Sequence, residues 1–122
     1  MRSLLLMLIM MLSYPLFSQN LRSGGKLKPE QAIMDIRHYT LVLEVDPEQK
    51  TINGSTEIDL ILSQSSSLLL LDLWNGLTVK QVLVNGKPEN FTHLDDLIRI
   101  TNSSLWSAGK IKIKVKKMLT KI

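Results

Sequence analysis

The stretch His38–Leu62, HYTLVLEVDPEQKTINGSTEIDLIL, decides the fold because two alternating runs flank a single turn. In the first run, His38–Asp46, apolar side chains occupy every second position, at Tyr39, Leu41, Leu43 and Val45. Val42 departs from this pattern, since it falls among the polar residues His38, Thr40 and Glu44. The turn Asp46–Lys50 contains a proline, which presets the backbone angle that such a turn requires. The period of two predicts a β-strand with one dry face.

The second run, Thr51–Leu62, alternates in the same way. Its inner face carries Ile52, Gly54, Thr56, Ile58, Leu60 and Leu62. Its outer face carries Asn53, Ser55, Glu57 and Asp59. The two runs therefore predict a long antiparallel hairpin with one dry face and one wet face. A glycine inside a strand, here Gly54, predicts a bulge or a close approach by a neighbouring chain.

Further short apolar runs follow, separated by turn signals. We predict strands at Leu68–Leu73, Leu77–Val84, Phe91–Ile100 (with a bend at Asp95-Asp96) and Lys110–Lys116. Turns are expected at Asn75-Gly76 and Asn85-Gly86, and a loop carrying Trp106 at Asn102–Gly109. About seven short strands with regular turn signals are typical of an all-β fold, mostly antiparallel, as a sandwich or an open curved sheet.

The first 18 residues read as a secretory signal peptide rather than as part of the fold. Arg2 precedes the uncharged apolar run Leu4–Leu12, which is shorter than the roughly 20 residues that a spanning helix needs. We expect a helical signal peptide over 1–18, cleaved after Ser18, and a secreted or periplasmic protein with no stable membrane insertion afterwards. The alternative is a buried N-terminal helix. Residues 19–34 contain Ser23-Gly24-Gly25 and predict a flexible lead-in.

The composition excludes several classes of chemistry. The chain has 122 residues, which suits one domain, and it has no cysteine, which excludes disulfides and thiolate metal sites. The net charge of +4 comes from lysines near the C-terminus, which alternate with Ile111, Ile113 and Val115. This alternation favours a strand with a solvated lysine face over a nucleic-acid stripe, because no aromatic residue interleaves the lysines to stack bases. We expect no nucleic acid among the partners.

The search for catalytic residues is mostly negative. H-E-x-x-H, phosphate-binding glycine loops and G-x-S-x-G are absent from the sequence. A histidine lies near carboxylates at His93, Asp95 and Asp96, and carboxylates share the wet face at Glu44, Glu57 and Asp59. The first group could bind a metal or act as a base, and the second could serve acid–base work. We favour a simpler interpretation, in which the first group belongs to a polar loop and the second to a solvated sheet face. We therefore predict no catalytic, cofactor-binding or metal residue and no cofactor.

The ordered series of motifs resembles the N-terminal domain of aminopeptidase N-like zinc metallopeptidases. The segment Asp35–Asp46 (DIRHYTLVLEVD) is similar to the opening strand of that family, and Ile52–Ile58 (INGSTEI) to its glycine-centred return strand. Leu70–Leu73, Leu77–Val79, Val82–Pro88 and Ala108-Gly109 follow in the family's order. The resemblance implies a saddle-shaped, mostly antiparallel β domain over residues 35–116.

The family removes N-terminal residues from peptides with one zinc ion, which the two histidines of H-E-x-x-H and a later glutamate hold. None of these positions exists in this sequence, so no site residue is transferred and zinc is expected only in the complete family protein. The tail 117–122 departs from the family pattern, which has an aromatic residue and then glycine there. We expect an incomplete domain, shortened by a frameshift or an early stop, with some strand edges unpaired.

These observations favour a non-catalytic fragment of a secreted zinc aminopeptidase-like protein that is not an enzyme on its own. A stand-alone secreted binding or adaptor module is the alternative, with another protein docking on an exposed sheet edge. A binder of nucleic acid or acidic surfaces through the terminal lysines ranks last.

Overall fold

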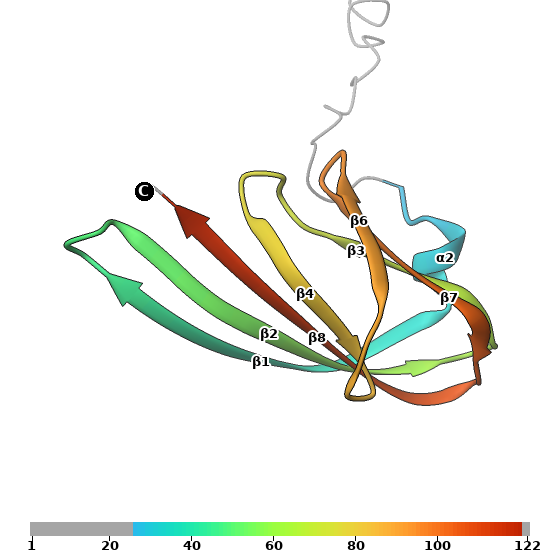
Figure 1. Ribbon diagram of the computed structural model, residues 1–122. Helices are drawn as coiled ribbons and strands as arrows, with labels where there is room; N and C mark the ends of the chain where they lie inside the picture. The colour runs from blue at the N-terminus through green and yellow to red at the C-terminus, as the bar shows by residue number, and fades with distance from the viewer. Residues whose placement is uncertain (1–25, 121–122) are drawn as a thin grey trace, which may run out of the picture.

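The computed structural model describes residues 26–120, and the predicted signal peptide and residues 19–25 of the lead-in lie outside this range. The all-β prediction is confirmed, since the described residues form eight strands and one short helix (Figure 1). The elements in chain order are α2 (Pro29–Ala32), β1 (Met34–Asp46), β2 (Thr51–Leu62), β3 (Ser66–Asp72), β4 (Thr78–Val84), β5 (Lys87–Pro88), β6 (Asn90–Leu94), β7 (Leu97–Trp106) and β8 (Gly109–Thr120).

Two antiparallel sheets make up the fold. The larger sheet has the strand order β1-β2-β8-β4-β5, and the smaller sheet has the order β3-β7-β6. Consecutive strands form hairpins at β1-β2 and β6-β7, whereas β8 is inserted between β2 and β4. Neither sheet closes into a barrel, so each keeps two edges. Figure 1 shows β1, β2 and β8 extending well beyond the region where β3, β6 and β7 lie.

The predicted turns form where the sequence placed them. Asn85 and Gly86 both have positive φ, as do Asp95 and Asp96, which is the backbone geometry of tight two-residue hairpin turns. The turn after β1 is held by the Asp46 carboxylate, whose Oδ1 accepts hydrogen bonds at 3.0 Å from the backbone N–H groups of Glu48 and Gln49.

The core lies between the two sheets at one end of the larger sheet. The alternation of β8 is confirmed, because Ile111, Ile113 and Val115 are buried while Lys112 is exposed. The other core residues come from both sheets: Ile58, Leu60, Leu62, Leu69, Leu71, Val82, Val84, Ile98, Ile100 and Trp106. Apolar burial on this inner face supplies the main driving force for folding.

The buried face of the first hairpin is shorter than predicted, and the prediction of a dry face along all of His38–Asp46 was wrong. The predicted β1-β2 hairpin forms, and in its register Tyr39 faces Ile58 while Leu41 faces Thr56. However, Tyr39, Leu41, Leu43 and Val45 are each more than half exposed. The reason is that the smaller sheet covers only the end of the larger sheet near Leu62, so the face continues past its cover toward the hairpin tip.

Three further differences between the prediction and the structure concern where helices and strands begin and end. Trp106 ends β7 and is buried, although the sequence placed it in a loop. Strand β8 continues four residues beyond Lys116, to Thr120. Residues Pro29–Ala32, within the predicted flexible lead-in, form the single helical turn α2, which packs against β3. Pro29 suits the start of this turn because its missing N–H would be unpaired there in any case.

A pair of leucine substitutions tests the location of the core. Leu69 is fully buried in β3, whereas Leu105 in β7 is 66% exposed. We expect Leu69→Ala to lower the free energy of unfolding by about 2–5 kcal/mol, because it leaves a cavity in packed surroundings. The matched control Leu105→Ala should change it by less than about 0.5 kcal/mol. Chemical denaturation followed by circular dichroism measures both values, and equal losses would contradict this core.

Candidate binding surface on the larger sheet

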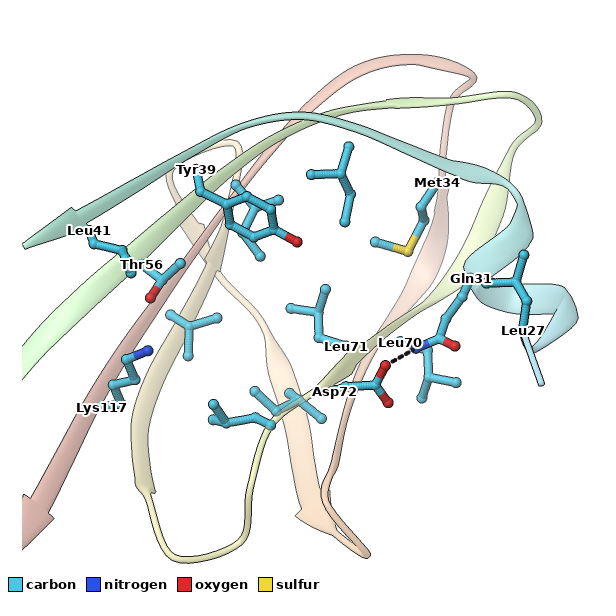
Figure 2. Close-up of a pocket in the computed structure, with 15 residues that line it drawn as sticks. Leu27, Gln31, Met34, Tyr39, Leu41, Thr56, Leu70, Leu71, Asp72 and Lys117 are labelled. Carbon is cyan, nitrogen blue, oxygen red and sulfur yellow. Dashed lines mark hydrogen bonds between the residues drawn. The ribbon is translucent and has the colours of Figure 1, made fainter. Parts of the chain in front are cut away.

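An open groove lies on the inner face of the larger sheet, beside the core. Its volume is about 460 Å³. Figure 2 shows Met34, Tyr39 and Leu41 contributed by β1, facing Leu71 of β3 across the opening. The remaining lining residues come from α2, β1, β2, β3, β7, β8 and the segments next to α2 and β3: Leu27, Gln31, Ile36, Thr56, Ile58, Leu70, Asp72, Leu73, Ile98, Val115 and Lys117. The lining is therefore mainly apolar, with a few polar groups at the rim.

The rim contains one hydrogen bond between an amide and a carboxylate. Gln31 Nε2 in α2 donates to Asp72 Oδ2 at the end of β3, with a distance of 3.0 Å (Figure 2). This bond joins α2 to the smaller sheet and occupies one carboxylate oxygen that faces the groove. The arrangement can bind an apolar or mixed surface, but the groove residues do not pair a nucleophile with a base.

Thr56 is the one polar residue among the buried side chains of the described part of the chain. It lies on the inner face of β2, between Leu41 on β1 and Val115 on β8 in the register. Its Oγ1 is buried and has no hydrogen-bond partner. A buried hydroxyl without a partner costs free energy, so this atom marks a polar spot in the floor of the groove.

The groove continues into the exposed part of β1. The exposed fractions are 55% for Tyr39, 61% for Leu41, 57% for Leu43 and 56% for Val45. Val42, on the opposite face, is also 61% exposed. Single exposed apolar residues are normal, but a contiguous row of four on one strand is typical of an interaction surface.

Gly54 allows β1 and β2 to come close together in this region. A Cβ atom added at Gly54 would meet the Val42 carbonyl oxygen and lie 2.9 Å from Leu43 Cδ2. The predicted close approach of a neighbouring chain is thus confirmed, and that neighbour is β1. The bulge lies elsewhere, between Ile36 and His38 on β1.

The histidine and carboxylate group at the β6-β7 turn does not form a site. His93 Nε2 lies 2.9 Å from the Leu73 carbonyl oxygen. Asp96 Oδ1 accepts a hydrogen bond of 2.8 Å from the Asn75 N–H, and Asn75 Oδ1 accepts one of 3.0 Å from the Asp96 N–H. These side chains fasten two turns to each other, which supports the interpretation as a structural loop.

Two carboxylates of the wet face, Glu57 and Asp59, form ion pairs with lysines. Glu57 lies 3.4 Å from Lys114 Nζ and 3.8 Å from Lys112 Nζ, and Asp59 lies 3.6 Å from Lys112 Nζ. Glu44 faces Asn53 across the hairpin. These ion pairs are partly exposed, so each contributes little to stability. Among residues 26–120, no group of three or more His, Cys, Asp or Glu residues could hold a metal ion.

The sequence did not reveal the groove, because the groove depends on how the two sheets overlap. Val42 breaks the alternation by placing an apolar side chain on the wet face, away from the groove, and the structure leaves it exposed. In the described part of the chain, no helix is long and apolar enough to cross a membrane.

The fold has clear counterparts among solved structures. An M1 zinc metallopeptidase mutant from Deinococcus radiodurans, bound to a Tyr-Ser-Ala substrate, matches with a TM-score of 0.63 and 21% identity, over 74% of this chain and 21% of its own. Yeast leukotriene A4 hydrolase in complex with bestatin matches with a TM-score of 0.63 and 20% identity, over 82% of this chain and 17% of its own. No protein-family model matches the sequence, and a search of curated proteins finds no match.

These similarities confirm the predicted fold. The β architecture of this chain is one that occurs within M1 zinc metallopeptidases, as the resemblance of the motifs implied. The chain spans about a fifth of the length of those structures.

A substitution at Thr56 tests the polar spot in the groove. Thr56→Val replaces the unpaired hydroxyl by a methyl group of similar size, so we expect the free energy of unfolding to rise by about 1 kcal/mol. The control Thr40→Val makes the same change on the exposed face of β1 and should have little effect. Chemical denaturation compares the two variants. A loss of stability in Thr56→Val would indicate that the hydroxyl has a partner.

Proposed function

We propose that this chain is a non-catalytic domain of a secreted zinc aminopeptidase-like protein, equivalent to the N-terminal β domain of that family. The similarity of its fold to M1 zinc metallopeptidases is the observation that carries the proposal. The ordered motifs from Asp35 to Val115 also support it, because they resemble that family in the sequence alone. In this role the domain supplies an apolar surface on which other parts of a protein pack.

The described residues do not fit the zinc ion that the family uses. The two histidines lie far apart in the fold, with His38 on the outer face of the larger sheet and His93 bound to the Leu73 carbonyl in the smaller sheet. The carboxylates nearest to them hold turns or pair with lysines. We therefore derive no chemical step through zinc for this chain, and its contribution is structural.

The groove and the exposed row of β1 support a docking role. A domain that stands in front of a peptidase domain needs an apolar face that is covered only when the other part is present. The groove, with its volume of about 460 Å³ and its mainly apolar lining, is such a face. The apolar surface of the groove continues along β1 at Tyr39, Leu41, Leu43 and Val45. No part of residues 26–120 covers these four side chains.

A stand-alone secreted binding module is the second candidate function. The observation that favours it is the long edge strand β1, whose apolar side chains are exposed. An exposed edge can accept a strand from another protein through main-chain hydrogen bonds. The DNA immediately downstream discriminates the two functions. A coding region for H-E-x-x-H in any frame supports the peptidase origin, and an unrelated gene after a clean stop supports the module.

The proposal predicts that the purified protein neither retains zinc nor cleaves aminoacyl reporter substrates. Metal analysis after dialysis and a fluorogenic aminoacyl assay with added zinc measure these properties. The positive control is a complete M1 zinc metallopeptidase, such as the enzyme from Deinococcus radiodurans, treated in parallel. One equivalent of zinc that survives dialysis, or turnover above the protein-free rate, would contradict the non-catalytic role.

A further inference from the structure

Strand β1 is the open edge of the larger sheet. It pairs with β2 on one side, and no strand between residues 26 and 120 pairs with its other side. At the opposite edge of the same sheet, β5 has only Lys87 and Pro88 and pairs with Leu83 and Val84 of β4, so its proline limits further pairing there. In β1, the bulge between Ile36 and His38 ends the regular ladder at one side, so the segment His38–Asp46 remains as a regular exposed edge.

The pattern of apolar and polar side chains in this segment is the same when the segment is read in either direction. Its centre is Val42, the residue that breaks the alternation. Moving outward from the centre, the matched positions are Leu41 with Leu43, Thr40 with Glu44, Tyr39 with Val45, and His38 with Asp46. Each pair is either apolar on both sides or polar on both sides, and no pair combines two like charges.

Such symmetry is what antiparallel self-pairing requires. In a two-fold dimer the same segment contributes both strands, and residues directly opposite each other share a face of the joined sheet. Pairing centred on Val42 sets apolar side chains against apolar ones on the inner face. On the outer face it sets Val42 against its own copy and the His38 ring against the Asp46 carboxylate.

Neighbouring registers fit less well. Centring the pair on Leu41 would place Val42 opposite Thr40 and Val45 opposite Arg37. Centring it on Glu44 would place the two Glu44 carboxylates opposite each other, which is unfavourable. The register centred on Val42 is also the one that uses every residue of the regular segment His38–Asp46.

We propose that this protein forms a two-fold dimer by antiparallel pairing of its β1 strands, centred on Val42. The occupant of the exposed edge is thus a second copy of the chain. The dimer joins the two five-stranded sheets into one continuous sheet and brings both apolar grooves to the same side. It gives each of the five exposed apolar residues of the segment an apolar cross-strand neighbour, including Val42, which is 61% exposed in the single chain. This inference uses β1 alone and stands apart from the peptidase origin.

Cysteine cross-linking tests the register directly, because the natural chain has no cysteine. In the proposed dimer the two Val42 residues are directly opposite, at a Cα separation of about 5 Å, which a disulfide can bridge. Val42→Cys should therefore form covalent dimers quantitatively under mild oxidation. Thr40→Cys on the same face is the control, since the two copies of residue 40 would lie four positions apart, about 13 Å along the ladder. It should stay uncross-linked.

Sedimentation velocity over a range of concentrations tests the association itself. The unchanged full chain should show a monomer–dimer equilibrium. Val42→Lys places two positive charges at the axis and should weaken the dimer at least roughly ten-fold, a cost of about 1.4 kcal/mol. Leu105→Lys makes a similar change at a residue that is 66% exposed in the smaller sheet, and it should leave the dimer intact. Circular dichroism and thermal melting of each variant check that the monomer still folds.

Several outcomes would overturn the proposal. The first is a monomer at every concentration. The second is equal cross-linking of Val42→Cys and Thr40→Cys, which would indicate random collision. The third is a full chain that stays monomeric while a chain beginning at residue 19 dimerises, which would assign the edge to the N-terminal segment instead. These results are independent of zinc content and hydrolysis, so failure here leaves the proposed function untouched.

Discussion

The structure depends on how much of the inner face of the larger sheet is covered by the smaller sheet. Apolar burial drives folding, and here it is concentrated where the smaller sheet packs over Leu60, Leu62, Val84 and Ile113. Along β2 the inner-face residues change from fully buried at Leu62 to half-buried at Ile52, as the strand leaves this cover. The groove, the unpaired hydroxyl of Thr56 and the exposed apolar face of β1 all lie at this transition. They occur because the larger sheet is longer than the smaller sheet that packs on it.

The sequence predicts local structure well because local structure depends on nearby residues. The strands at His38–Asp46 and Lys110–Lys116 and the turns at Asn85-Gly86 and Asp95-Asp96 follow from side-chain period and backbone freedom, and all of them are confirmed. The overlap of the two sheets depends on contacts far apart in the chain, so the exposure of Tyr39 and Leu41 was not predictable. The burial of Trp106 and the strand extension to Thr120 were missed for the same reason.

The exposed apolar surface of the larger sheet is the basis of the proposed role. The polar clusters that suggested chemistry have structural partners: His93 and Asp96 hold two turns together, and Glu57 and Asp59 pair with lysines. The uncovered apolar residues within residues 26–120 lie on β1 and in the groove, where the Thr56 hydroxyl also lacks a hydrogen-bond partner. An exposed apolar surface of this kind is typical of a site of packing or association. The proposals for a scaffold domain and for a β1 dimer both use this surface.

Residue-resolved hydrogen–deuterium exchange in dilute solution tests the uneven cover most directly. Strand β8 is paired on both sides, by β2 and β4, and its inner face is buried, so its amides from Ile111 to Val115 should exchange near the rate set by global unfolding. Strand β1 is paired on one side and exposed on both faces, so the amides of Tyr39–Val45 should exchange through local opening and be far less protected. Equal protection of the two strands in dilute solution would contradict the account.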